Sequence, residues 1–179
     1  MPLTFKLREP SVQQVLNLRR WEELTEGGDW GIPEIHRVET DRHGRLVVHE
    51  PLTAQHGAFQ SEVLTRLHQR IPRGMVVTVC PLSTSDGVKI LDAGWMSRER
   101  YEPMRDCVVF DMAPEICVEI LSSSNTDAEM EEKRDLYFEI GCLEFWTVGA
   151  TGKVRFFGAG GVELANSLIC PAFPGQIEL

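Results

Sequence analysis

Two acidic residues stand within apolar stretches of the sequence. Glu119 interrupts the apolar run over residues 116–121, and Asp92 lies in the apolar segment Val88–Ala93. A lone carboxylate in a buried strand is destabilising unless a cation or hydrogen-bond donors meet it. Two such carboxylates on adjacent strands repel each other unless a divalent cation or a shared proton relieves them. Asp92 and Glu119 are therefore candidate ligands of Mg²⁺ or Mn²⁺, which prefer hard oxygen donors.

A lysine beyond Glu119 is placed to meet it. A capping-box pattern over residues 126–129 starts a helix after the strand, and Gly141 ends it. Such a helix usually returns antiparallel to the strand. Glu119 then lies about 7 Å back from the strand's end and Lys133 about 9 Å back along the helix, so the two share a level. The stripe that carries Lys133 also carries Met130, Tyr137 and Ile140. Lys133 is therefore expected to point inward.

Two carboxylates, a divalent cation and an inward lysine together suit phosphodiester hydrolysis. The cation would polarise a phosphate and lower the pKa of a water, and Lys133 would orient that water or offset developing charge. Spacing alone leaves a second interpretation open, because structural ion-pair networks resemble functional ones. In that interpretation Glu119 and Lys133 form a structural ion pair, and Asp92 caps a turn.

The rest of the pattern predicts one domain of the α/β class, bordering on α+β, with a mixed central sheet flanked by helices in three layers. Three helices are expected, over residues 11–24, 54–71 and 126–140. Strands are expected over residues 35–39, 45–48, 75–80, 88–93, 116–121, 144–148, 153–157 and 162–164. A charged loop is expected over Ser97–Arg105, and Asp92 is expected to face one way with Ile90 and Gly94.

Length and composition narrow the protein class. The chain has 179 residues, which suits a single domain, and a formal net charge of −9. That charge argues against broad electrostatic capture of DNA but leaves room for a local basic groove. No apolar run reaches membrane-spanning length, and residues 1–10 carry charges where a signal peptide needs an apolar centre. The five cysteines form no CxxC pair, which predicts reduced, buried thiols in a cytoplasmic protein.

Several short motifs, in order, resemble the Uma family of putative restriction endonucleases. They are Glu-Ile-Leu-Ser-Ser-Ser at 119–124, Glu-Lys-Arg-Asp-Leu-Tyr at 132–137, Leu-Glu-Phe-Trp-Thr-Val at 143–148, the segment 45–56 that ends in His56, and Phe-Pro-Gly at 173–175. The resemblance covers about residues 35–179. It implies a nuclease-like domain over 35–179, preceded by an N-terminal helical extension over 1–34.

That family belongs to the PD-(D/E)XK nuclease superfamily, so the resemblance implies a restriction-endonuclease-like fold and a divalent metal, Mg²⁺ or Mn²⁺. The superfamily's aspartate falls on Asp92 and its glutamate on Glu119. Its lysine normally follows the glutamate by two positions, where this chain has Leu121, and in the family it is expected on the next helix, at Lys133. The chain departs from the pattern at Leu91, where a proline usually precedes the aspartate.

Two further residues are expected beside the catalytic trio as substrate-binding positions. His56, on the core stripe of its helix, would contact a phosphate or a water of the site, or else is a hydrogen-bonded, half-buried histidine. Tyr137 lies one turn after Lys133 and is expected to pack against the lysine stem. The other histidines show no paired metal-ligand spacing, and Glu115 is a reserve carboxylate at the strand's entrance.

The resulting hypothesis is a metal-dependent endonuclease that acts on DNA, in which Asp92 and Glu119 bind the metal and Lys133 assists the attacking water. We expect no membrane partner and a homodimer, because cutting both strands benefits from two sites related by a twofold axis. The helix over residues 11–24 is the expected interface element. The alternatives are a catalytically silent nuclease-fold protein that acts through dimerisation or partner binding, and a small-nucleotide phosphohydrolase if the site is a closed pocket.

Overall fold

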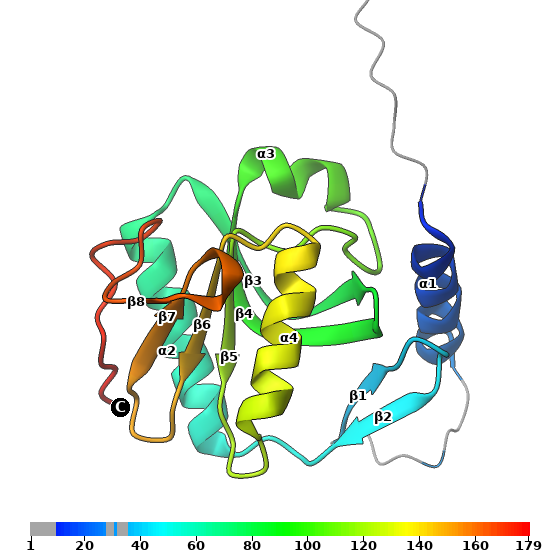
Figure 1. Cartoon of the computed structure of the whole chain (residues 1–179), viewed down its shortest axis with the longest axis horizontal. Coiled ribbons are helices and arrows are strands. Elements are labelled where there is room, and N and C mark those ends of the chain that lie inside the picture. The colour runs from blue at the N-terminus through cyan, green and yellow to red at the C-terminus, as the bar shows by residue number, and fades with distance from the viewer. Residues whose placement is uncertain (1–9, 28–30, 32–35) are drawn as a thin grey trace, which may run out of the picture.

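A six-stranded mixed sheet forms the centre of the molecule (Figure 1). The computed structural model describes residues 10–27, 31 and 36–179. The strands follow one another in chain order across the sheet: β3 (Gly74–Thr84), β4 (Gly87–Ser97), β5 (Ile116–Ile120), β6 (Glu144–Val148), β7 (Val154–Phe157) and β8 (Glu163–Leu164). Only the β5–β6 pair is parallel, and the neighbouring pairs are antiparallel. The predicted mixed sheet is therefore confirmed.

Helices cover both faces of the sheet, which makes three layers (Figure 1). Helix α2 (Ala54–Arg70) packs on one face through Phe59, Val63 and Leu67. Helix α4 (Asp127–Glu139) packs on the other face, where Tyr137 lies in a second apolar cluster with Phe145. The apolar stripes read from the sequence are thus the buried faces of both helices.

Strands β1 (Arg37–Thr40) and β2 (Leu46–His49) form a separate two-stranded hairpin, and β1 packs against β4 of the central sheet. It lies against β4 because β5 pairs with β4 only from Ala93 to Trp95. Beyond that point the edge of β4 is covered by side chains of β1. Thr40 Oγ1 accepts the N–H of Val88 at 2.9 Å, and Glu39 Oε1 accepts that of Ile90 at 3.0 Å. Two buried backbone donors are satisfied in this way.

Helix α1 (Val12–Thr25) begins at the N-cap Ser11 with a complete capping box. It packs on the β3–β4 hairpin through a polar residue, because Asn17 is buried and its amide donates to Ser83, Thr84 and Gly87. Four apolar residues of the helix are exposed, whereas Trp21 and Leu24 are partly buried; the exposed ones are Val12, Val15, Leu16 and Leu18. The helix is therefore present as predicted, but the apolar residues of its first half are exposed.

Some local predictions are wrong. The expected loop Ser97–Arg105 contains helix α3 (Arg98–Tyr101) and the 3₁₀ turn η1 (Glu102–Met104), capped by the hydroxyl of Ser97. A further 3₁₀ turn, η2 (Ala159–Gly161), precedes β8. The expected start of the first strand at residue 35, and the proposed domain boundary at 34/35, lie outside the described residues.

All five cysteines are free thiols, as predicted. Four are buried, and Cys107 is exposed. Burial raises the pKa of Cys80 to about 12 and that of Cys117 well above the usual range, which leaves these thiols uncharged and unreactive. Within the described part of the chain, no helix has both the length and the apolar character that crossing a membrane requires.

Candidate active site

The two predicted carboxylates lie on neighbouring strands. β4 and β5 are antiparallel with Ala93 opposite Val118, and one further step in that register sets Asp92 opposite Glu119. Both residues are buried, at 2% exposure. The main chain of Ile120 also binds Asp92, since its N–H donates to Oδ2 at 2.8 Å. The point where β4 and β5 separate therefore holds both acids.

Asp92 sits at a break in the alternation of β4, which differs from the predicted pattern. Leu91 packs into the cluster under α4, whereas Ala93 and Trp95 pack into the cluster under α2. The facing residue in β3 is Val79, whose φ of 47° is unusual for a β-branched residue. The carbonyl of Asp92 accepts hydrogen bonds from the side chains of Gln60 and Thr78. Backbone distortion of this kind is concentrated at functional sites in proteins.

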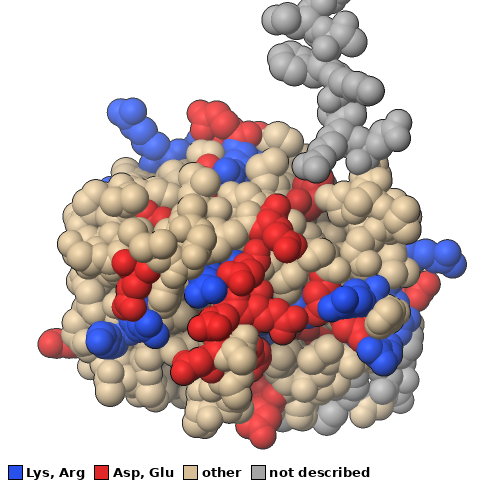
Figure 2. Space-filling model, viewed as in Figure 1, with Lys and Arg blue, Asp and Glu red and all other residues tan. Residues whose placement is uncertain are grey.

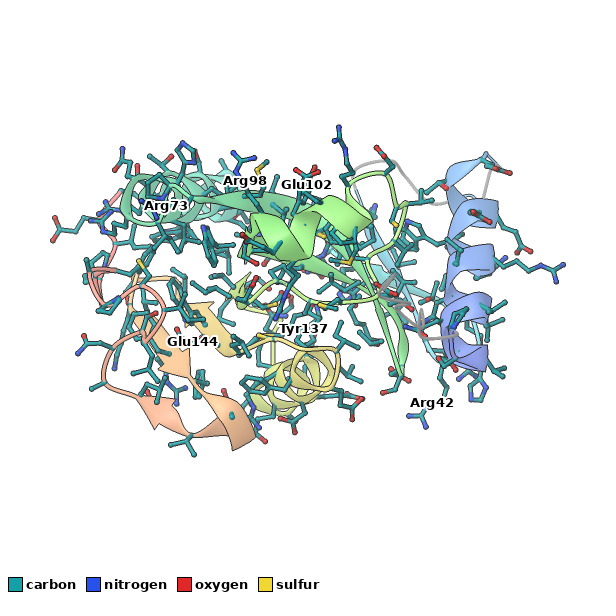
Figure 3. The ribbon with its side chains drawn as sticks, turned by 90° about the horizontal axis from the view of Figure 1, so that it is seen from above. Arg42, Arg73, Arg98, Glu102, Tyr137 and Glu144 are labelled. Carbon is teal, nitrogen blue, oxygen red and sulfur yellow. The ribbon has the colours of Figure 1, made fainter. Side chains whose placement is uncertain are left out.

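Lys133 meets Glu119, as the spacing predicted. Its Nζ lies 3.5 Å from Glu119 Oε2, and the side chain is 5% exposed. Tyr137, one turn later, donates its hydroxyl to Glu119 Oε1 at 2.9 Å. Figure 3 shows Tyr137 projecting from α4 toward the sheet. Tyr137 therefore does more than pack against the lysine stem, because it directly positions the Glu119 carboxylate.

The structure adds two residues that the sequence analysis missed, both on β1. Glu39 Oε1 accepts a hydrogen bond from Lys133 at 2.9 Å, shorter than the contact of Lys133 with Glu119. The guanidinium of Arg37 donates to Asp92 Oδ1. Arg37 and Glu39 are two residues apart on one strand, so their side chains lie on the same face. The signal in the sequence was this alternation of polar residues around Val38.

Two histidines complete the cluster. His56, at the start of α2, has Nε2 3.4 Å from Asp92 Oδ1, and its side chain is 5% exposed. His49, on β2, has Nε2 3.1 Å from Glu39 Oε2. The prediction that placed His56 at the site is consistent with this contact. The spacing of histidines in the sequence does not reveal His49, because its partner in the structure is the carboxylate of Glu39 and not a second histidine.

Glu115, the reserve carboxylate, lies outside this cluster. It accepts hydrogen bonds from the backbone and hydroxyl of Ser97, and its Oε1 lies 3.3 Å from Nε of Arg100. Arg100 also donates to the carbonyls of Ala113 and Gly141. Glu115 thus joins α3 to the body of the domain and has a structural role.

The carboxylates of the cluster differ in their protonation behaviour. Burial raises the pKa of Glu119 to about 7, and nearby Asp92 adds to this effect while Lys133 opposes it. Burial would also raise the pKa of Asp92 and of Glu39. His56 and Arg37 nevertheless hold the pKa of Asp92 below its usual value, and His49 and Lys133 do the same for Glu39. Glu119 is therefore the acid whose negative charge is least compensated by the protein.

Lys133 stays charged in this setting. Burial would lower its pKa, but the carboxylates of Glu119 and Glu39 hold the pKa above its ordinary value. Apart from the histidines, the three carboxylates of Asp92, Glu119 and Glu39 face two cations, Lys133 and Arg37. A bound cation would add positive charge beside the ionised form of Glu119.

Two of these carboxylates could hold a divalent metal if they released some of their present hydrogen bonds. In the described residues, no three His, Cys, Asp or Glu side chains form a ready-made metal cluster. Mg²⁺, however, is usually held by one or two carboxylates together with water and substrate phosphate. Asp92 and Glu119 supply such a pair, and the raised pKa of Glu119 is the property that a neighbouring cation would relieve.

A cleft of about 240 Å³ opens beside the cluster. One wall is the loop Ser122–Asn125, which precedes α4, and the other is the segment 49–56, which joins β2 to α2. Arg37, His49 and His56 line the cleft, whereas the three carboxylates do not. Because each of these three residues also approaches a carboxylate, they form the boundary between the cleft and the acids.

Comparisons with known proteins identify a family and a shared fold. The model of the Uma2 family, described as "Putative restriction endonuclease", matches residues 21–165. The crystal structure of a putative nuclease of the DUF820 family from Anabaena variabilis has a TM-score of 0.65 and 15% sequence identity; the match covers 80% of this chain and 82% of that one. At that identity the similarity shows a shared fold. No curated protein matches the sequence.

Proposed function

This chain belongs to the Uma2 family of putative restriction endonucleases, and from that premise we propose that it is a Mg²⁺- or Mn²⁺-dependent endonuclease acting on DNA. The observation that carries the proposal is the set of three buried residues, Asp92, Glu119 and Lys133, gathered where β4 and β5 separate. Two carboxylates and a lysine at one point are the groups that metal-assisted phosphodiester hydrolysis requires.

Asp92 and Glu119 are proposed to hold the metal. When bound, the ion supplies Lewis-acid polarisation of the phosphate and an activated water nucleophile. Binding would require Asp92 to release part of its contact with Arg37, since one oxygen accepts from Arg37 and the other from Ile120. It would also favour the ionised form of Glu119, whose pKa is about 7.

Lys133 is proposed to orient the attacking water and to offset the charge that develops on the phosphate. Glu39 and Glu119 hold its ammonium group between them, at 2.9 and 3.5 Å, and raise its pKa, so that it remains a cation. A fixed buried cation of this kind stabilises a transition state without reorganising. His56 is proposed to contact the substrate phosphate, and Tyr137 to hold Glu119 in place through its hydroxyl.

Cleavage of plasmid DNA tests this proposal. We expect Mg²⁺- or Mn²⁺-dependent cleavage that EDTA abolishes and that Asp92→Asn and Lys133→Ala remove. Arg66→Ala, on the far turns of α2, is a matched control that should cleave normally, because Arg66 pairs only with Glu62 there. A purified, folded protein that cleaves neither plasmid DNA nor single-stranded circular DNA with either metal would contradict the proposal.

The second candidate function is a catalytically silent nuclease-fold protein that acts through dimerisation or partner binding. The observation that favours it is the closed ion-pair network, in which Arg37 and Lys133 already meet the three carboxylates without a metal. A wild-type protein that binds no Mn²⁺ and never cleaves, yet unfolds when Lys133 is replaced, would support this alternative.

We also propose a homodimer, with α1 as the interface element. Val12 is 89% exposed and Val15 53% exposed, on a helix that contacts the domain through the buried Asn17. Burying these apolar side chains against a second copy would be favourable. Analytical ultracentrifugation at micromolar concentration should show a dimer, and Val12→Glu with Val15→Glu should give a monomer; a monomeric wild type would contradict this.

A further inference from the structure

Among the described residues, four buried side-chain nitrogens have no hydrogen-bond partner. They are Nε of Arg37, Nε2 of His49 and both ring nitrogens of His56. The two Nε2 atoms approach carboxylates at 3.1 and 3.4 Å but lack hydrogen-bond geometry. Buried polar groups are nearly always paired, so a set of unpaired ones calls for an explanation. All four belong to the three residues that line the cleft beside the carboxylates.

These nitrogens are suited to an anion. The Nε of Arg37 is a donor, and each imidazole offers a donor in either tautomer. His56 is more than nine-tenths buried, lines the cleft, and has its Nε2 3.4 Å from Asp92 Oδ1. Hydroxyl and amide groups of the loop Ser122–Asn125 line the opposite wall. A phosphodiester group entering the cleft would therefore meet the guanidinium of Arg37 and the two imidazoles on one side and polar groups on the other, although the lining also includes one acid, Glu50.

The size of the cleft limits what can carry that phosphodiester. A volume of about 240 Å³ is below the range of pockets that enclose drug-sized ligands. It is enough for one phosphate with part of its nucleotide. Asp92 and Glu119 are only 2% exposed, so a phosphate must enter the cleft to reach them. An unpaired strand can turn a single phosphate into such a cleft more readily than a paired duplex, whose phosphates are fixed on a regular helix.

The surrounding charge also disfavours a duplex. The loop Ser122–Asn125 leads directly into α4, whose outer face is acidic, with Asp127, Glu131, Glu132, Asp135 and Glu139 exposed. Figure 2 shows acidic side chains gathered over this part of the molecule. The chain as a whole has a formal net charge of −9. A second strand lying outside the cleft would add phosphates on the side of the N-terminal end of α4, where Asp127 is exposed, and repulsion would weaken its binding.

We propose that the cleft is a binding site for a single, unpaired nucleic-acid strand, with Arg37, His49 and His56 holding one phosphodiester. The proposal rests on the proposed nuclease function, because it assigns the substrate class of that same site. It predicts a substrate that is single-stranded or locally unpaired at the point of attack.

The test is direct binding, measured apart from cleavage. Fluorescence anisotropy is followed with a labelled 12-nucleotide single-stranded DNA and with the same strand in a duplex, with Ca²⁺ in place of Mg²⁺ and the probe checked for integrity afterwards. We expect the single strand to bind at least tenfold more tightly than the duplex. Arg37→Met should weaken single-strand binding about tenfold and make the slope of log K against log salt shallower by about 0.7, the value for one phosphate contact on a single strand.

Two further variants make this result decisive. Arg66→Met removes one positive charge from α2 outside the cleft and should change neither affinity nor slope beyond a small amount. His49→Leu leaves the Arg37–Asp92 contact in place and should also weaken single-strand binding, which keeps the test valid if Arg37→Met fails to fold.

The outcomes separate this inference from the proposed function. Equal or tighter binding of the duplex, or unchanged affinity in both cleft variants, would overturn the inference even if DNA is cleaved. Equal affinity for a dinucleotide and for the 12-nucleotide strand would also overturn it and assign the cleft to a small nucleotide. Preferential single-strand binding by a protein that never cleaves would support the inference and refute the proposed function.

Discussion

Replacing Lys133 with methionine removes one of two cations from a group of three buried carboxylates. The ammonium lies 2.9 Å from Glu39 and 3.5 Å from Glu119, and its side chain is 5% exposed. Removing one partner of a buried ion pair typically costs about 3–5 kcal/mol of folding free energy. We expect a loss of about 3 kcal/mol, at the lower end of that range. The pKa of Glu119 is already about 7, so the variant can protonate Glu119 and avoid an uncompensated buried charge.

A metal should reverse much of this loss, which makes the effect measurable. A ligand present at 100 times its Kd stabilises the folded state by about 2.7 kcal/mol. The variant should gain more than the wild type, because Mn²⁺ would supply the charge that Lys133 no longer provides. The variant should nevertheless cleave at least about 10²-fold more slowly than the wild type, since Lys133 is proposed to stabilise the transition state.

Urea unfolding of both proteins, with EDTA and with Mn²⁺, is the assay. The predicted result is a difference in unfolding free energy that narrows when Mn²⁺ is added. Lys153→Met, at an exposed position in the β6–β7 turn region, is the matched control and should unfold like the wild type. A difference of the same size in EDTA and in Mn²⁺ would refute the reasoning, because it would mean that no metal reaches the carboxylates near Lys133.

Two further predictions concern single carboxylates. Glu119 has a pKa of about 7 when folded, above its ordinary 4.5, so folding favours its protonated form; without metal, the wild type should lose up to about 3 kcal/mol as the pH rises from 5 to 8. Glu119→Gln should not show this decline in urea unfolding, and an identical decline would contradict the assignment. Glu144 accepts hydrogen bonds from Trp146, Leu168 and Ile169, so Glu144→Gln should lose about 1–3 kcal/mol. Its cleavage rate below the melting temperature should stay normal, and a lost rate in a stable variant would count against a purely structural role.

The central part of the site could be predicted because it depends on local geometry. Glu119 and Lys133 are 14 residues apart, on a strand and on the helix that follows it. The rise per residue in each element sets their levels, and the apolar stripe sets the direction of Lys133. Asp92 followed from an acidic residue in a largely apolar strand. These inferences needed no knowledge of contacts between distant segments.

Arg37 and Glu39 could not be placed in this way. Their strand has only four residues, and its polar residues resemble those of a solvent-exposed hairpin. They reach the site because β5 leaves β4 beyond Ala93 and β1 covers the edge that is left. Glu39 is 94 residues from Lys133 in the sequence. Only the assembled sheet shows that the inward face of this hairpin is its polar face.

The orientation of α1 was also beyond the sequence. An amphipathic pattern predicts that the apolar side is buried, but it does not name the partner. Asn17 fixes the polar side to the β3–β4 hairpin through three hydrogen bonds. Val12, Val15, Leu16 and Leu18 are therefore left exposed, while Trp21 and Leu24 are partly buried.

The most direct test of the central claim is the position of a metal. Crystals soaked in Mn²⁺ should give an anomalous-scattering peak within about 2.2 Å of one oxygen of Asp92 and one of Glu119, a normal ligand distance for such ions. Asp92→Asn crystals treated in the same way should lose most of that peak. A wild-type map without a peak there, with Asp92 still bound to Arg37 and Glu119 still beside Lys133, would contradict the claim that this cluster is a metal-dependent nuclease site.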